Sequence, residues 1–213
     1  MKVFRAETLH DAAYREIVFL LREGGIIAFP TDTAYGLGVD PFNSGAVDRV
    51  FQTKGRAETK PLLLVVDSVA MAEAVSNPVP MFHEVAARFW PGPLTIIVPA
   101  AESLPSNTTG GTDTIGLRWP IAPFATALVN RFGPITATSA NRSGFPAPIT
   151  AEEVRVQLGG SIDVLIDGGK LPARGGSTVV DLTADPPVLL REGPILFGEL
   201  DDFFKGRLRR HVA

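Results

Sequence analysis

Small polar side chains gather in one short stretch, directly after an apolar segment that we expect to form a strand. Residues 24–40 read GGIIAFPTDTAYGLGVD, in which residues 26–29 are apolar and Pro30 ends the run. The loop that follows contains Thr31, Asp32, Thr33, Tyr35, Gly36 and Gly38 within nine positions. A loop of this kind brings hydroxyls and bare backbone to one point, which is how α/β proteins commonly build ligand sites. We expect it to contribute hydrogen bonds rather than charge.

Cationic side chains accompany other predicted strands. Lys54, Arg56 and Lys60 lie on a loop that runs into PLLLVV, whose lack of alternation predicts a strand covered on both faces. These three cations could clamp phosphates or a carboxylate, or they could form an ordinary solvated loop. Arg118 ends the apolar strand predicted at 114–118 and should be partly buried against an anion. That anion is either a ligand or a structural carboxylate.

Two further polar loops complete the set. The segment TSANRSG begins at Thr138, while Ser177 follows Arg174-Gly-Gly and Arg191 ends the next strand. Their hydroxyls and amide suit a polar ligand, although an Asx or ST turn and plain surface charge would also explain them. Together the loops describe a pocket with several cations, many hydroxyls and no nucleophile. Such a pocket suits phosphoryl or nucleotidyl transfer, in which cations and metal ions stabilise phosphate charge.

Several common catalytic classes lack their motifs here. The sequence contains no G-x-x-x-x-G-K-[ST], no G-x-G-x-x-G and no G-x-S-x-G. The chain has no cysteine, which excludes disulfides, thiolate metal sites and a cysteine nucleophile. His10, His83 and His211 lie far from the polar loops in sequence, so we do not expect a histidine general base.

The elements expected to position these loops alternate between helices and strands. We predict helices at 8–23, 44–53, 68–75, 80–89, 120–132 and 150–158, and a mostly helical C-terminal segment at 194–213. We predict strands at 26–29, 61–66, 94–98, 114–118, 134–138, 163–166, 177–182 and 188–190. Thr8 should cap the first helix, Gly24-Gly25 should end it, and Thr150 with Glu153 should form a capping box. The pattern predicts one α/β domain over residues 1–213, with a mixed, mostly central sheet flanked by helices.

Composition limits the range of partners. The net charge of −3 over 213 residues gives no global electrostatic reason for binding nucleic acid, so any basic site must be local. The first 18 residues are charged throughout and show no signal peptide, and no apolar run approaches the roughly 20 residues of a membrane span. We therefore expect a cytoplasmic protein without a membrane partner.

The ordered motifs resemble one known family. PTDTAYGLG, KGR with KPL, FWPGPLT, GLRWP, SANRSG and STVVDLT follow the order found in YrdC/Sua5-type threonylcarbamoyl-adenylate synthases, over about residues 10–193. The resemblance implies a twisted α/β sheet around a large, locally positive cavity. It also implies synthesis of threonylcarbamoyl-AMP and pyrophosphate from L-threonine, bicarbonate and ATP with Mg2+. The product would feed the machinery that makes N6-threonylcarbamoyladenosine at position 37 of tRNA.

The resemblance also implies roles for individual residues. The residues that would hold L-threonine are Thr33, Arg118, Ser139 and Ser177. The residues that would surround ATP are Arg56, Lys60, Thr114, Asn141 and Arg191. Lys54 and Arg56 would act in catalysis by offsetting phosphate charge, whereas the metal ligands are unknown.

The chain departs from the family pattern at a few positions. Ala57 replaces a common proline, Ala34 replaces valine, Ile149 replaces a threonine, and Val65 stands where long members have histidine. The absence of a threonine hydroxyl at Ile149 would remove one contact to the nucleotide.

The sequence argues against two alternative hypotheses. A non-catalytic RNA-binding module of the same fold would normally add exposed aromatics, but the chain has only two tryptophans and two tyrosines. A carbamoyl-transferring relative of hydrogenase maturation would carry cysteine-rich zinc motifs. The C-terminal Arg207, Arg209, Arg210 and His211 could touch tRNA weakly, or they could belong to the end of a helix.

Overall fold

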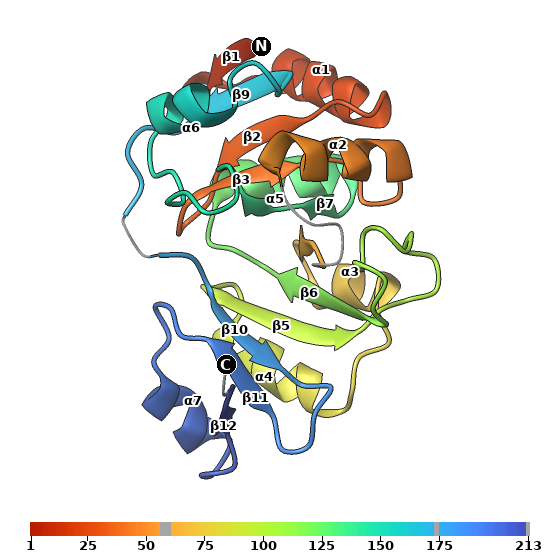
Figure 1. Cartoon of the computed structure of the whole chain (residues 1–213), viewed down its shortest axis with the longest axis vertical. Helices are drawn as coiled ribbons and strands as arrows, with labels where there is room; N and C mark the ends of the chain where they lie inside the picture. The colour runs from red at the N-terminus through yellow and green to blue at the C-terminus, as the bar shows by residue number, and fades with distance from the viewer. Residues whose placement is uncertain (56–60, 173–174, 212–213) are drawn as a thin grey trace.

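The computed structural model describes residues 1–55, 61–172 and 175–211, and within these ranges the chain forms two mixed β-sheets, one above the other in Figure 1. The upper sheet contains, in spatial order, β1 (Lys2–Arg5), β9 (Val164–Asp167), β2 (Ile27–Pro30), β3 (Tyr35–Gly38) and β8 (Thr138–Ser139). The lower sheet contains β12 (Arg209–Arg210), β11 (Val188–Arg191), β10 (Thr178–Asp181), β5 (Leu94–Pro99), β6 (Thr114–Arg118), β4 (Leu63–Val65) and β7 (Ile135–Thr136).

Helices cover both sheets. They are α1 (Asp11–Arg22), α2 (Ser44–Lys54), α3 (Val69–Ala74), α4 (Met81–Phe89), α5 (Pro123–Phe132), α6 (Ala151–Leu158) and α7 (Phe197–Phe203), with a 3-10 turn at Ala6–Thr8. The expected mixed α/β architecture is confirmed, and it is built on two sheets. None of the helices in the described ranges combines the length and apolar character that a membrane crossing requires.

The upper sheet is covered on both faces. Ile27 and Phe29 of β2 pack in a core with α1 and α5, whereas Ala28 packs in a second core with α2 and α6. Successive side chains of a strand point to opposite faces, so a strand buried on both sides needs an unbroken apolar run. This arrangement explains the continuous hydrophobicity of residues 26–29.

The lower sheet buries one face against helices. Ile96 of β5, Ile115 and Leu117 of β6 and Val180 of β10 share a core with α3, α4 and α7. Because side chains alternate, the residues between them point to the other face, toward the upper sheet. The lower sheet is therefore free to line a site between the two layers.

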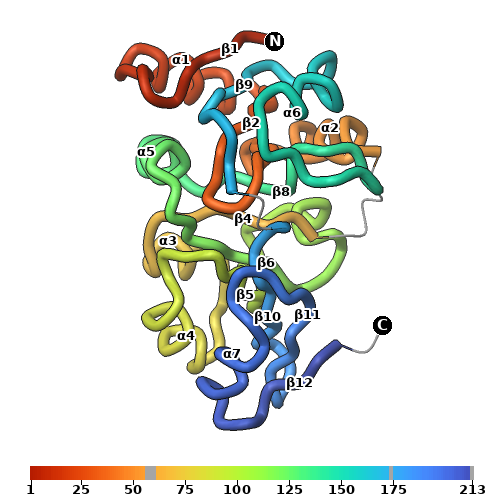
Figure 2. The backbone as a smooth tube through the Cα atoms, turned by 90° about the vertical axis from the view of Figure 1, so that its left-hand side faces the viewer, coloured from red at the N-terminus to blue at the C-terminus, as the bar shows by residue number. Residues whose placement is uncertain are grey.

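The chain passes from the lower to the upper sheet within a single predicted strand. Residues Ile135–Thr136 pair with β4 below, and Thr138–Ser139 pair with β3 above. Ala137 lies between them and donates its backbone N–H to Leu63 at 2.8 Å. Figure 2 shows the two sheets from the side, with β8 in the upper sheet and β4 in the lower one. The strand expected at 134–138 is thus divided where it changes sheets.

Two of the predicted helix ends are confirmed and one is wrong. The glycines at 24–25 end α1 as expected: Gly24 has φ of 80°, and Gly25 donates to the Leu20 carbonyl at 2.8 Å. The hydroxyl of Thr150 accepts from the Glu153 N–H at 3.2 Å, as a cap should. The predicted Thr8 cap is wrong, because α1 begins at Asp11 after the 3-10 turn.

Three strands lie where we predicted none. The polar loop after β2 is shorter than expected, because Tyr35–Gly38 returns as β3 and pairs with β2 in a hairpin. β1 adds a strand beside β9, and β12 lies in the C-terminal segment that we expected to be mostly helical. Arg209 and Arg210 are therefore strand residues, and Arg210 pairs with Glu192 at 2.9 Å.

Gly38 offers a test of the hairpin packing. A Cβ at this position would lie 2.8 Å from Cε1 of Phe29 and 3.1 Å from the Thr136 carbonyl oxygen. We expect Gly38→Ala to lower the free energy of unfolding by about 1–3 kcal/mol, because the buried ring and the backbone must move. The control is Gly45→Ala in α2, whose Cβ would meet only Asn43 Oδ1 at 3.5 Å. Urea unfolding that shows equal stability for both variants would contradict this packing.

Candidate active site

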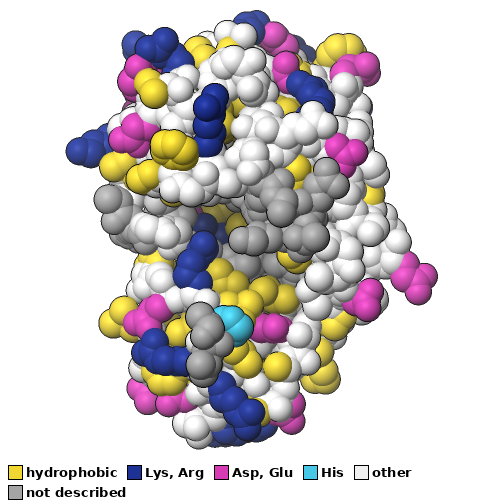
Figure 3. Space-filling model, viewed as in Figure 1, with side chains coloured by type: hydrophobic (Ala, Val, Ile, Leu, Met, Phe, Trp, Pro, Cys, Tyr) yellow, Lys and Arg dark blue, Asp and Glu magenta, His cyan; other side chains and the backbone are white. Residues whose placement is uncertain are grey.

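A cavity of about 370 Å³ lies between the two sheets. Its floor is the free face of the lower sheet, from Val65 through Gly116 to Val179, and its roof includes the β2–β3 turn and residues 137–139. Figure 3 shows a hollow at this height, with hydrophobic side chains inside it and basic side chains beside it. The polar loops singled out from the sequence therefore meet at the junction of the two sheets.

Strand alternation sets the floor of the cavity. In β6, Ile115 and Leu117 pack in the lower core, so Thr114, Gly116 and Arg118 share the opposite face. Gly116 and Arg118 line the cavity. A Cβ at Gly116 would lie 3.2 Å from Cγ2 of Thr95, so glycine avoids a close contact on the floor of the cavity and leaves space above it.

Of the two described cations that line the cavity, Arg118 is the more enclosed. It is 4% exposed, and its guanidinium donates from Nη1 to the Thr33 hydroxyl at 2.9 Å and from Nη2 to Asp32 Oδ1 at 2.5 Å. Nε donates to the carbonyl of Gly92 at 3.4 Å. The predicted buried anion partner of Arg118 is thus a carboxylate of the protein itself. Our expectation that the loop after β2 contributes no charge is wrong, because Asp32 lies in it.

Burial and charge act on Arg118 in opposite directions. Burial is the largest influence and lowers the pKa of Arg118, while the nearby Asp32 carboxylate raises it. The guanidinium of Arg191 lowers the pKa of Arg118 further. Because the two arginines repel each other, an anion bound between them would stabilise both.

Arg191 and Ser177 form a second polar cluster. The Ser177 hydroxyl is 2.7 Å from that of Thr95 and accepts from Arg191 Nη2 at 3.2 Å. Arg191 Nε donates to the Ser177 carbonyl at 2.9 Å. Partial burial lowers the pKa of Arg191. All three residues line the cavity, so the predicted Ser177 and Arg191 lie side by side.

The β2–β3 turn is internally hydrogen-bonded. The Thr31 hydroxyl donates to the Ala34 carbonyl at 2.6 Å and accepts from the backbone N–H groups of Thr33 and Ala34 at 3.3 Å each. The buried Tyr35 that follows donates its hydroxyl to the Gly169 carbonyl at 2.8 Å. Burial is the main cause that raises the pKa of Tyr35 to about 12. These bonds hold Thr33 at the cavity wall.

Lys54 lies behind the cavity wall. Its side chain is buried, and the ammonium donates to the carbonyl oxygens of Ser139 and Asn141, the latter at 2.8 Å. The Lys54 carbonyl in turn accepts from the Ser143 N–H at 2.8 Å. Ser139 lines the cavity, whereas Lys54 and Asn141 support it from outside. Lys54 therefore fixes the segment that carries Ser139.

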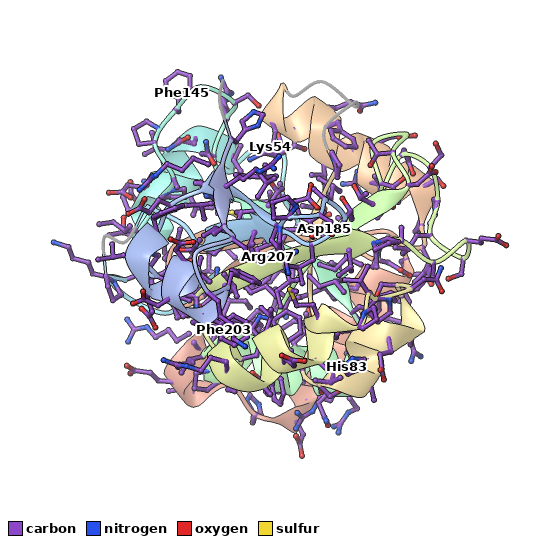
Figure 4. The ribbon with its side chains drawn as sticks, turned by 90° about the horizontal axis from the view of Figure 1, so that it is seen from below. Lys54, His83, Phe145, Asp185, Phe203 and Arg207 are labelled. Carbon is purple, nitrogen blue, oxygen red and sulfur yellow. The ribbon has the colours of Figure 1, made fainter. Side chains whose placement is uncertain are left out.

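The remaining predicted residues lie elsewhere. Thr114 is on the cavity face of β6 but beyond the lining residues. Arg56 and Lys60 lie outside the described residues, so the structure does not place them. His83 contacts Glu73 at 2.7 Å on a side of the molecule away from Lys54 (Figure 4). Within the described ranges, no group of three or more His, Cys, Asp or Glu side chains could hold a metal ion.

Two polar residues of the site were not predicted. Asp32 stands between the two threonines of the polar loop, but we assigned it no role in the site. Thr95 lies in the strand predicted at 94–98, to which we assigned no site residue, but alternation with the core residues Ile96 and Val98 would have placed it on the cavity face. The signal for Thr95 was present in the sequence, whereas the contact of Asp32 with Arg118 depends on the fold.

The chain is similar to known proteins of one family. Residues 19–193 match the Sua5/YciO/YrdC family, which carries the description telomere recombination. The chain is 40% identical over 209 residues to a threonylcarbamoyl-AMP synthase of Pyrococcus abyssi, a match that covers 97% of this chain. It is 40% identical over 189 residues to the threonylcarbamoyl-AMP synthase of Bacillus subtilis, covering 87% of this chain. The chain spans 61% and 55% of the lengths of these two relatives.

The structural match is equally extensive. The structure of P. abyssi Sua5 complexed with L-threonine superposes with a TM-score of 0.90 at 40% identity. The superposition covers 99% of this chain and 62% of that chain. The resemblance drawn from the ordered motifs is confirmed, and the chain belongs to the Sua5/YciO/YrdC family.

Proposed function

We propose that this protein is a nucleotidyltransferase that makes threonylcarbamoyl-AMP from L-threonine, bicarbonate and ATP. The observation that carries the proposal is the buried Arg118, which lies beside the Thr33 hydroxyl and lines the cavity between the sheets. A fixed guanidinium next to small hydroxyls suits the carboxylate of an amino acid. The names of the two relatives and the threonine complex of P. abyssi Sua5 support the same reaction.

The reaction has two steps. The amine of threonine takes up CO2 from bicarbonate to give a carbamate, with release of water. A carbamate oxygen then attacks the α-phosphorus of ATP in line, and pyrophosphate leaves with the electrons of the broken P–O bond. Neither step requires a covalent bond to the protein, so the chain contributes position and charge stabilisation.

The threonine half of the cavity is formed by Thr33, Arg118, Ser139 and Ser177. Arg118 would take the carboxylate, and the hydroxyls would take the remaining polar groups of the amino acid. Arg191 contacts Ser177, and its positive charge also acts on Arg118. We therefore propose that Arg191 lies where the two substrates would meet. It would stabilise charge on the phosphate under attack.

The nucleotide half extends from Arg191 and along β6. Thr114 shares the face of Arg118 further along the strand, so it would contact a ligand longer than an amino acid. The nucleotide residues proposed with it are Arg56, Lys60 and Asn141. Ile149 offers no hydroxyl to this half.

Lys54 and Arg56 are proposed to act in the chemical step. Lys54 places a positive charge directly behind Ser139, and Arg56 would add a second charge at the phosphates. Loss of the charge that Arg56 would place at the phosphates could slow the chemical step by about 10²–10³-fold, or 3–4 kcal/mol, whereas Lys54 would act from behind Ser139 without touching the phosphates. ATP would enter as its Mg2+ complex, so the metal belongs to the substrate.

The remaining parts of the proposal concern the setting. The chain would form one domain over residues 1–213, with a locally positive cavity. The product would pass in the cytoplasm to the machinery that forms N6-threonylcarbamoyladenosine in tRNA. Any direct tRNA contact by this chain would be weak.

The proposal is tested by supplying the three substrates. Incubation with ATP, bicarbonate and L-threonine should release pyrophosphate and yield threonylcarbamoyl-AMP, measured by coupled phosphate detection and mass spectrometry. Omitting any one substrate should abolish the adenylate, because each contributes atoms to it. Pyrophosphate release that is independent of L-threonine, without the adenylate, would reject the assignment.

Arg118→Ala separates the two halves of the cavity. We expect the KM for L-threonine to rise about 10- to 100-fold, because a charged hydrogen bond is worth about 1.5–3 kcal/mol, and the KM for ATP to rise less. Arg131→Ala is the control, since Arg131 pairs with Asp11 on the surface at 3.0 Å. A larger rise in the KM for ATP than for threonine would mean that the halves are reversed.

A further inference from the structure

The ion pair of Asp32 with Arg118 differs from the other described ion pairs in its burial. Its two side chains are 11% and 5% exposed. In every other ion pair between described residues, both side chains are at least 36% exposed. Exposed pairs contribute little to stability, and a buried pair requires compensation for the water that both charges lose. The Asp32 carboxylate is therefore a specific feature of this site.

Asp32 lies outside the cavity and can influence it through its contact with Arg118. Arg118 and Thr33 line the cavity, but Asp32 does not. The carboxylate is presented by the hydrogen-bonded turn around Thr31, which is closed by the bond from the Thr31 N–H to the Ala34 carbonyl at 3.2 Å. Asp32 thus binds the Arg118 guanidinium from outside the cavity, and the hydrogen-bonded turn fixes the position of its carboxylate.

The hydrogen bonds of Arg118 leave part of the guanidinium available. An arginine side chain has five N–H donors. The described partners are Asp32 on Nη2, Thr33 on Nη1 and Gly92 on Nε. Each of the two terminal nitrogens carries a second N–H, and a carboxylate binds best to two such donors held in one plane. The direction of those donors depends on what fixes the first three.

We propose that Asp32 is a positioning residue for the amino-acid substrate. It fixes the plane of the Arg118 guanidinium and offsets the unfavourable burial of its charge, so that two N–H groups remain directed at a substrate carboxylate. This proposal rests on the proposed function, because it assumes that the carboxylate belongs to L-threonine. Asp32 makes no contact with the substrate itself.

The competing physical effect has the opposite sign. The negative charge of Asp32 also repels a carboxylate bound to the same guanidinium, so its removal could tighten binding by simple charge attraction. The geometry favours positioning, because Arg118 is almost fully enclosed and an unpaired buried charge would reorient or recruit water. Weaker threonine binding after removal of the Asp32 charge would indicate positioning, and tighter binding would indicate charge repulsion.

The test is direct binding of L-threonine to Asp32→Asn, measured by calorimetry without ATP. Asparagine keeps the shape and one acceptor oxygen but removes the charge. We expect the Kd for L-threonine to rise about tenfold, as for loss of one charge-assisted hydrogen bond, while the Kd for ATP changes less than about twofold. Asp32→Glu restores the charge and should bind L-threonine more tightly than Asp32→Asn. If the asparagine variant does not fold, Asp32→Glu is compared with the wild-type protein instead.

Asp163→Asn is the matched control. Asp163 also accepts from an arginine, Arg49 at 3.2 Å, and from the Ile26 N–H at 2.8 Å, but it does not line the cavity. This variant should lower the unfolding temperature without changing the Kd for L-threonine. If it weakened threonine binding as much as Asp32→Asn, the effect would be general destabilisation and the proposal would be overturned.

A double-mutant cycle tests whether Asp32 affects threonine binding through Arg118. Asp32→Asn should add little to the threonine defect of Arg118→Lys, because both changes disturb the same guanidinium. Additive effects, or unchanged or tighter threonine binding by Asp32→Asn, would overturn the positioning role alone. A wild-type protein that binds no L-threonine would overturn the proposed function as well, so the two failures are distinguishable.

Discussion

A nearly enclosed arginine is the constraint on which the site depends. Arg118 is 4% exposed, and a guanidinium cannot give up its charge to become compatible with burial. The fold must therefore surround it with acceptors, which come from a turn above it and from the backbone at Gly92 below it. The same enclosure makes Arg118 a strong anchor for an anion, because screening by water is weak there.

The two-sheet architecture explains how such an enclosure arises. The upper sheet is covered on both faces, whereas the lower sheet buries one face under helices and leaves the other directed upward. The chain changes sheets at Ala137, so the roof and floor of the cavity are joined by continuous backbone. Polar residues on the free face thus occupy a partly enclosed space without interrupting a hydrophobic core.

Local patterns in the sequence predict much of this structure. Continuous apolar runs predict β2 and β4, helical spacing predicts α2 and α4, and the polar loops at Thr33, Arg118 and Ser177 do meet in one cavity. The division into two sheets was not predictable, because pairing partners depend on contacts distant in the chain. For the same reason the Asp32 partner of Arg118 was missed: 86 residues separate them, and only the fold brings them together.

The central claim is that the cavity between the sheets holds L-threonine with its carboxylate on Arg118. A crystal structure of this protein grown with L-threonine tests it most directly. Our account predicts the amino acid between the two sheets, with its carboxylate oxygens about 2.7–2.9 Å from the guanidinium nitrogens, as in charge-assisted pairs. Threonine bound in the cavity with its carboxylate turned away from Arg118, or bound elsewhere on the protein, would contradict it.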